Sequence, residues 1–214
     1  MNLDYLALGK LSKNKVVPTQ IIVSNSEPTI RDAFFKPGGW EDIANVKAKD
    51  KKLLVTQEGT GLLINGRKGK TNNISTKKHY QDIEFHLEFM LAKNSNAGVY
   101  FMGRYEIQIF DSYGKEKWTF SDLGGLYQRW PPQRGAGVPA KVNASKAPGE
   151  WQTMDVIFRA PRFDETGRRT AQAYFKEVKI NGQIVQENLY AGGPTRSSQF
   201  NDEATKGPIM IQGD

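Results

Sequence analysis

Cysteine is absent from this 214-residue chain, and histidine occurs only twice. The chain therefore has neither disulfides nor thiolate metal sites, a composition that suits the cytosol and the periplasm equally. Its first residues, MNLDYLALGKLSKNK, also lack the apolar core of a secretory signal, because Asp4, Gly9 and Lys10 interrupt it. Either the protein is cytoplasmic or its leader is missing from this sequence, and of the two we expect a periplasmic or secreted protein.

Long apolar runs are absent too. No stretch of about 18 consecutive apolar residues occurs, so the sequence predicts no membrane span. The 30 Lys and Arg residues outnumber the 23 Asp and Glu residues and give a net charge of +7. These basic residues are spread thinly instead of forming a patch, and no nucleic-acid-binding motif accompanies them. We therefore expect no nucleic-acid partner.

Helical periodicity is scarce, whereas short alternating runs recur from residue 53 onward with turn residues between them. This pattern is typical of a β-sandwich or barrel. In QDIEFHLEFML the apolar and polar side chains alternate cleanly, and AGVYFMG and RYEIQIF form the next predicted strand pair, joined at Gly103. We predict an all-β domain over residues 31–214, with residues 1–30 as an N-terminal extension or edge strand.

The run GRYEIQIFDSYG, residues 103–114, places acid and amide groups among apolar residues. In a strand, Glu106 and Gln108 would share one face while their apolar neighbours point to the other. A bulge near Phe110 would bring Asp111 to the same face. We therefore predict a cluster of three polar side chains on one side of a sheet.

A second predicted strand, residues 82–90, which we expect to be a neighbour of this one, carries Glu88 and His86 on its polar face. If the two strands are adjacent, Glu88 joins Glu106 and Asp111 as a candidate catalytic residue, and His86 becomes a candidate metal ligand or base. Each residue also has a plainer interpretation, because alternating polar residues commonly cover a solvated sheet face and a lone histidine is more often structural.

Two long irregular stretches, 112–149 and 191–207, separate the later strands. Loops of this length inside a domain are usually functional or disordered, and the aromatic residues of the first stretch favour a rim over a binding face. Arg104 could hold a hydroxyl or a carboxylate of a ligand through its fork of donors, and Asn143 also fits a loop-fixing role. The predicted substrate-binding residues are Arg104, Gln108, Tyr100, Tyr127, Trp130 and Asn143.

Several blocks occur in a characteristic order: NAGVYFMGRYEIQIFDSYG, GGLYQ, VNASKAPGEWQTMDVIFRAPRFD, VKINGQIVQENL, GGPT and GPIMIQGD. In these blocks the chain resembles the bacterial 3-keto-disaccharide hydrolase domain over about residues 32–214. The resemblance implies a concanavalin A-like jelly-roll sandwich of two antiparallel sheets and cleavage of 3-keto-glycosides. Relatives usually continue past IQGD with a final strand, so we expect an unpaired sheet edge at the end of this chain.

The resemblance also implies a chemistry. A ketone at carbon 3 of a sugar acidifies the hydrogen on carbon 2, so a base can remove it, the glycosidic oxygen leaves carbon 1, and water adds to the resulting enone. This route needs a base, an acid for the leaving group and a donor or divalent metal that stabilises the enolate. We expect a saccharide substrate, a divalent metal ion and no organic cofactor.

Other functions stay open. The Glu-x-Gln-x-x-Asp spacing at residues 106–111 resembles the Glu-x-Asp-x-x-Glu strand of sandwich-fold β-glucanases, in which paired carboxyl groups lie about 5–5.5 Å apart. The same sandwich also suits a non-catalytic carbohydrate-binding module, and an unpaired terminal strand could serve assembly.

Overall fold

The computed structural model describes residues 4–8, 22–24, 34, 38–49, 53–65 and 71–213. These residues form strands joined by loops, and among them is one 3-10 turn, η1 (Pro132–Arg134). No helix within these ranges is long and apolar enough to cross a membrane.

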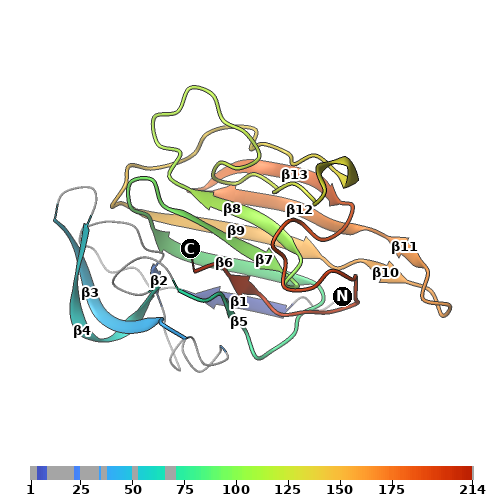
Figure 1. Ribbon diagram of the computed structural model, residues 1–214, viewed down its shortest axis with the longest axis horizontal. Helices are drawn as coiled ribbons and strands as arrows, with labels where there is room; N and C mark the ends of the chain where they lie inside the picture. The colour runs from blue at the N-terminus through green and yellow to red at the C-terminus, as the bar shows by residue number, and fades with distance from the viewer. Residues whose placement is uncertain are drawn as a thin grey trace.

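Two sheets form the body of the molecule (Figure 1). The larger sheet has the order β1-β6-β9-β12-β13. Strand β1 runs parallel to β6, whereas the other neighbouring strands of this sheet run antiparallel to each other. The strands are β1 (Asp4–Leu8), β6 (Ile83–Met90), β9 (Trp151–Arg159), β12 (Ala173–Ile180) and β13 (Gln183–Ala191).

The smaller sheet has the antiparallel order β5-β14-β7-β8. Its strands are β5 (Ile74–Ser75), β14 (Met210–Ile211), β7 (Asn96–Phe101) and β8 (Tyr105–Phe110). The predicted all-β sandwich is therefore confirmed. The expected unpaired edge at the end of the chain is wrong, because β14 is hydrogen-bonded on both sides, to β5 and to β7.

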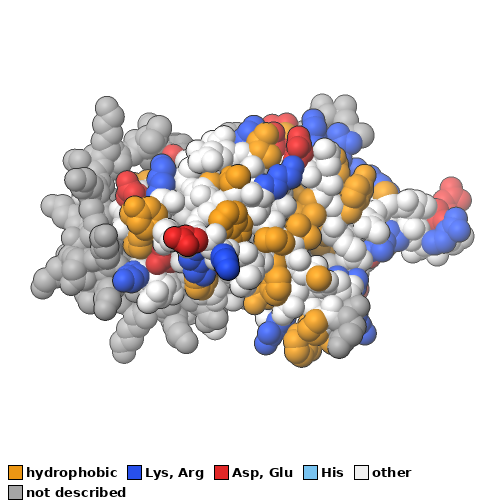
Figure 2. Space-filling view, turned by 90° about the horizontal axis from the view of Figure 1, so that it is seen from above, with side chains coloured by type: hydrophobic (Ala, Val, Ile, Leu, Met, Phe, Trp, Pro, Cys, Tyr) orange, Lys and Arg blue, Asp and Glu red, His pale blue; other side chains and the backbone are white. Residues whose placement is uncertain are grey.

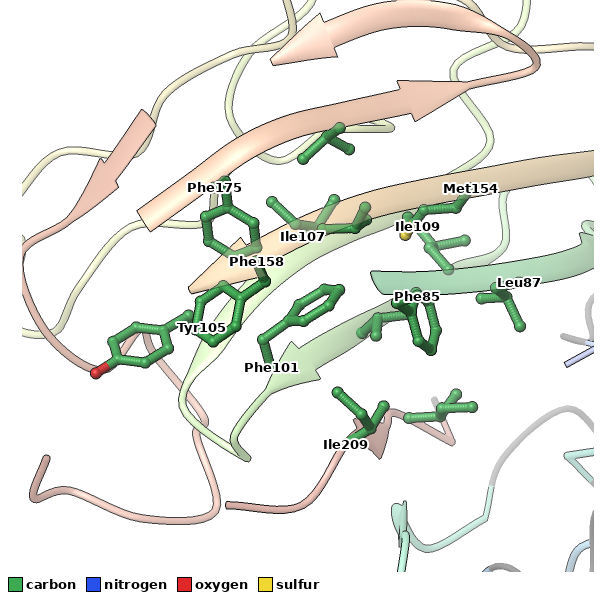
Figure 3. Close-up of a cluster of buried hydrophobic side chains, with 14 of the residues drawn as sticks. Phe85, Leu87, Phe101, Tyr105, Ile107, Ile109, Met154, Phe158, Phe175 and Ile209 are labelled. Atoms are coloured by element: carbon green, nitrogen blue, oxygen red, sulfur yellow. The ribbon is translucent and has the colours of Figure 1, made fainter. Parts of the chain in front are cut away.

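Alternating apolar residues from both sheets fill the space between them (Figure 3). Phe101 on β7 lies at the centre, with ring centroids 5.3 Å from each of Phe85, Phe158 and Phe175 on the larger sheet. Ile107 on β8 is completely buried in the same core. Since successive strand residues face opposite ways, the polar residues of β7 and β8 must lie on the outer face of the smaller sheet.

A third sheet, of order β2-β4-β3, lies at one end of the sandwich (Figure 1). It comprises β2 (Ile22–Ser24), β4 (Leu53–Ile64) and β3 (Glu41–Lys49). Its residues Ile43, Val46 and Ile64 form a second apolar cluster with Met90 of β6. At the opposite end, β10 (Arg162–Phe163) and β11 (Arg169–Ala171) form a projecting hairpin.

The stretch 112–149 is not a passive connection, because part of it extends the smaller sheet beyond β8. Tyr127 donates its backbone N–H to the Glu106 carbonyl at 3.0 Å, and Gln108 exchanges backbone hydrogen bonds with Gly124 and Gly125. Leu126 bridges onward to Val138. This pairing holds the loop beside the outer face that carries Glu106.

Candidate functional site

A pocket of about 200 Å³ opens on the outer face of β7 and β8. Glu106 pairs with Tyr100 across the two strands, and Gln108 pairs with Gly98, so these positions share the face that points away from the core. The residues that line the pocket come from both strands, the two long stretches and the chain end: Asn96, Tyr100, Glu106, Gln108, Tyr127, Arg196, Ser197 and Gln212. We call this the Glu106 pocket.

Glu106 is only 2% exposed although it lines the pocket. Burial raises the pKa of its carboxyl from 4.5 to about 8, and a hydrogen bond with the Tyr100 side chain opposes that rise. Burial favours the neutral form of a carboxyl because the charged form loses its hydration. A carboxyl that titrates near neutral pH can both take and give a proton, as general acid–base catalysis requires.

Gly98 makes room for this carboxyl. A Cβ at position 98 would lie 2.2 Å from Oε1 of Glu106, far inside the distance that real side chains tolerate. The Glu106 side chain therefore lies across β7 at the one position where β7 has no side chain. The glycine in the AGVYF strand is thus explained by the close approach of the carboxyl.

Backbone contacts fix the position of Glu106 along β8. Its N–H donates to Thr195 Oγ1 at 3.2 Å, and the same hydroxyl donates to the Arg104 carbonyl at 3.0 Å. The Glu106 carbonyl accepts from the Tyr127 N–H. Both long stretches therefore hold this strand while they form the walls of the Glu106 pocket.

Amides, hydroxyls and Arg196 make up the rest of the pocket lining. Gln108 Nε2 donates to Asn96 Oδ1 at 3.2 Å, and the Tyr100 hydroxyl donates to the Arg196 carbonyl at 3.3 Å. Glu106 is the one acidic side chain among the described residues that line it. Such a lining can bind several sugar hydroxyls and a carbonyl oxygen around a single acid or base, and it does not form the carboxyl pair of a glucanase-like site.

The predicted bulge at the end of β8 is wrong. The β7–β8 register is regular through Phe110, and Asp111 follows the strand. The Asp111 carboxylate accepts backbone N–H groups of Asn94 at 2.8 Å and Tyr113 at 3.4 Å. It therefore closes two turns and lies outside the lining of the Glu106 pocket.

The predicted adjacency of Glu88 and Glu106 is also wrong, because β6 belongs to the larger sheet and β8 to the smaller one. Glu88 and His86 lie on the outer face of the larger sheet, with the whole core between them and Glu106. Glu88 is 9% exposed, near the apolar cluster around Met90. His86 Nδ1 lies 2.6 Å from Asp155 Oδ1.

The described residues contain no group of three or more His, Asp or Glu side chains that could hold a metal ion. His86 and Asp155 together could supply two metal ligands, and Glu106 could supply one in its own pocket. The expected divalent metal therefore finds no fitting ligand set in the described parts of the chain.

Two of the predicted substrate-binding residues form hydrogen bonds that stabilise the fold instead. Arg104 is 4% exposed, and its guanidinium donates to the Met102 carbonyl and to both the carbonyl and the carboxylate of Asp202. Asn143 Nδ2 donates to the carbonyl of Ser112 at 2.7 Å. Neither residue lines the Glu106 pocket, and the side chains of both are engaged in fixing loops.

The other predicted binding residues lie on the expected face. Tyr100, Gln108 and Tyr127 line the Glu106 pocket, whereas Trp130 lines an adjoining hollow that shares Arg196 and Ser197 with it. Four lining residues are not among those predicted from the sequence: Asn96, Arg196, Ser197 and Gln212. A signal existed for three of them, because Asn96 is in phase with Tyr100, Arg196 directly follows GGPT, and Gln212 lies within IQGD.

Comparisons with known proteins agree with this architecture. One similar crystal structure is of a "putative glycosyl hydrolase" from Parabacteroides distasonis, with 25% identity, a TM-score of 0.58, and coverage of 82% of this chain and 72% of that one. A second structure so described, from the same organism, has 22% identity, a TM-score of 0.45, and coverage of 67% and 75%. No curated protein matches the sequence.

The family comparison covers far more than the strand that carries Glu106. Residues 25–214 match the family described as the 3-keto-alpha-glucoside-1,2-lyase-like domain, so the match includes the smaller sheet, every strand of the larger sheet except β1, and all the residues that line the Glu106 pocket. The chain therefore belongs to the 3-keto-alpha-glucoside-1,2-lyase-like domain family.

Proposed function

We propose that this protein cleaves 3-keto-glucosides by removing the proton on carbon 2, eliminating the group on carbon 1 and hydrating the product. Family membership and the most similar structure described above support the broader assignment to carbohydrate-active enzymes. The observation that carries the finer proposal is Glu106, a buried carboxyl with a pKa of about 8 and the one acidic side chain among the described residues that line its pocket.

Glu106 is the base of the proposed reaction. Its carboxylate takes the proton from carbon 2, and the electron pair of that bond moves onto the ketone oxygen at carbon 3 as an enolate. A base is most effective when its pKa lies close to the working pH, and burial brings Glu106 into that range. An ordinary exposed glutamate, with a pKa near 4.5, would be a much weaker base.

Donors around the pocket stabilise the enolate oxygen. The Tyr127 hydroxyl, the Arg196 guanidinium and the Gln212 amide all belong to the lining. Donors that are already positioned stabilise charge as it develops, without reorganisation during the reaction. These three groups are candidates for the same role.

Collapse of the enolate then breaks the bond between carbon 1 and the glycosidic oxygen. The departing oxygen needs a proton, and Glu106 holds the proton that it has just taken from carbon 2. Addition of water to carbon 1 and return of a proton to carbon 2 complete a net hydrolysis. If the enone departs before water adds, the same residues perform a lyase reaction.

The test is incubation of the protein with a 3-keto-disaccharide while release of the 3-keto-sugar is followed. Glu106→Gln keeps the shape of the side chain and removes the base, so the rate should fall about 10²–10⁴-fold. Glu165→Gln, on the exposed β10–β11 hairpin, is the matched control and should keep the wild-type rate. Wild-type activity in Glu106→Gln would reject the assignment of the base.

A non-catalytic carbohydrate-binding module is the second candidate. The lining favours it in one respect, because amides and tyrosines outnumber the single carboxyl. A module would bind the 3-keto-disaccharide and the parent disaccharide without converting either. Binding without turnover, across several 3-keto substrates, would support this candidate over the enzyme.

A further inference from the structure

A second hollow, of about 380 Å³, adjoins the Glu106 pocket. We call it the arginine hollow, because its lining includes Arg129, Arg134 and Arg196 beside Trp130. Two of its residues, Arg196 and Ser197, also line the Glu106 pocket, so the two spaces are contiguous. A ligand that fills the Glu106 pocket and extends beyond it can enter the arginine hollow.

The charged side chains among the described residues that line the arginine hollow are all positive. No acidic side chain among the described residues lines it, and none of its three guanidinium groups forms an ion pair with a described carboxylate. By contrast, Arg104 forms an ion pair with Asp202, and Arg169 forms one with Glu203. Three unpaired cations around one hollow raise the local positive potential and favour an anion there.

Two of these arginines, Arg129 and Arg196, have side-chain contacts within the protein that hold them in place before any ligand binds. Arg129 Nη1 donates to the Arg134 carbonyl at 2.8 Å, while Arg129 Nε is buried with no hydrogen-bond partner among the described residues. Arg196 lies over the Trp130 ring, with 4.8 Å between the guanidinium carbon and the ring centroid. A fixed guanidinium loses less conformational freedom on binding than a free one, and its planar fork matches carboxylate and phosphate oxygens.

Trp130 has an unusual position for a tryptophan. It is 57% exposed, on the segment that leads into η1. Its ring offers an apolar surface beside the guanidinium groups. The face of the molecule drawn in Figure 2 likewise carries hydrophobic side chains next to Lys and Arg. The hollow therefore combines a flat apolar surface with an excess of positive charge.

We propose that the arginine hollow is a subsite for an anionic group, a carboxylate or a phosphate, on the leaving part of the substrate. The proposal rests on the proposed function for its orientation, since the reacting sugar occupies the Glu106 pocket. It adds a substrate class: glycosides whose departing portion carries a negative charge within reach of Arg134 and Arg196.

A binding experiment tests the subsite without requiring turnover. The ligands are 4-carboxyphenyl glucoside, its uncharged 4-carbamoylphenyl counterpart and 4-phosphophenyl glucoside, none of them oxidised at carbon 3. Dissociation constants are measured by calorimetry at low and high salt. Charge-assisted hydrogen bonds to two arginines should make the anionic ligands bind about tenfold more tightly than the neutral one at low salt. Whichever of the two anionic ligands binds more tightly shows whether the hollow prefers a carboxylate or a phosphate.

Variants locate the effect. Arg134 and Arg196 are exposed, so Arg134→Gln and Arg196→Gln should fold normally and should each reduce the preference for the anion. Arg168→Gln, at the tip of the distant β10–β11 hairpin, is the control and should keep the preference. Equal affinity for charged and neutral ligands, or a preference that survives both substitutions, would overturn the subsite. A subsite that behaves as expected in a protein that cleaves no 3-keto-glucoside would overturn the proposed function alone.

Discussion

Replacing Glu106 with Gln should change how the stability of the protein depends on pH. The pKa of the Glu106 carboxyl is raised by burial from 4.5 to about 8 in the folded protein. A raised carboxyl pKa means that the folded state holds its proton more tightly than the unfolded state does. The resulting contribution to stability is fully present below about pH 4.5 and is lost as the pH rises through 8.

The magnitude follows from the two pKa values. A difference of one pKa unit corresponds to about 1.4 kcal/mol, so the values 4.5 and 8 imply a change on the order of 5 kcal/mol across this pH range. The calculation applies because Glu106 is 2% exposed and is little screened by solvent. A glutamine at position 106 does not titrate, so the Glu106→Gln variant should lose this part of the pH dependence.

Urea unfolding at pH 5, 7 and 9 measures the effect. The unfolding free energy of the wild type should fall relative to that of Glu106→Gln between pH 5 and 9, leaving the variant the more stable protein at pH 9. Glu165→Gln, on the exposed hairpin, should follow the wild type throughout. Parallel curves for the wild type and Glu106→Gln would refute the raised pKa, and with it the reason for choosing Glu106 as the base.

Three further substitutions test the geometry around the site. Gly98→Ala places a Cβ 2.2 Å from the present position of Glu106 Oε1, so the carboxyl must move and the rate should fall about 10²-fold; an unchanged rate would show that the position of Glu106 is not critical. Trp130→Ala removes a 57%-exposed side chain and should weaken sugar binding while stability changes by less than about 0.5 kcal/mol; unchanged binding with a large loss of thermal stability would assign Trp130 to packing. Arg104→Ala removes the buried hydrogen bond to the Met102 carbonyl and the part-buried contacts with Asp202, and it should cost about 2 kcal/mol of stability or more without changing KM, as equilibrium unfolding and steady-state kinetics can separate. A raised KM in a stable protein would restore Arg104 as a binding residue.

Local alternation predicted the faces of the strands correctly. Phe85 and Ile107 enter the core and Glu106 and Gln108 leave it, because the two-residue period of a strand depends only on neighbouring residues. The polar face of β8, and the loop that borders it through Tyr127, could therefore be inferred from short stretches of sequence.

The pairing of strands could not be inferred in the same way. Strands β6 and β8 are close in the chain and share one alternating pattern, yet they belong to different sheets, because β7 turns back to β8 on the opposite layer. For this reason the alternating pattern alone predicts Glu88 and His86 beside Glu106, which the sheet order contradicts. Arg196 and Gln212 reach the pocket from stretches about 90 residues or more further along the chain, a distance at which periodicity carries no information.

The prediction that Asp111 shares the face of Glu106 was wrong for a different reason. Its short side chain follows the last residue of β8 and bonds to backbone N–H groups of Asn94 and Tyr113. Aspartate commonly closes turns in this manner, so the turn competes with the predicted bulge. The regular β7–β8 ladder shows that the turn prevails.

Exchange of the hydrogen on carbon 2 tests the central claim most directly. A 3-keto-glucoside is incubated with the protein in D₂O, and deuterium at carbon 2 of the released 3-keto-sugar is measured by mass spectrometry and NMR, with an enzyme-free sample as the baseline. Proton abstraction by Glu106 predicts deuterium at carbon 2 in the wild-type product, at a level above that baseline, and a loss of both exchange and cleavage in Glu106→Gln. Cleavage that leaves the original hydrogen on carbon 2 would contradict the account, because the glycosidic bond would then break without an enolate.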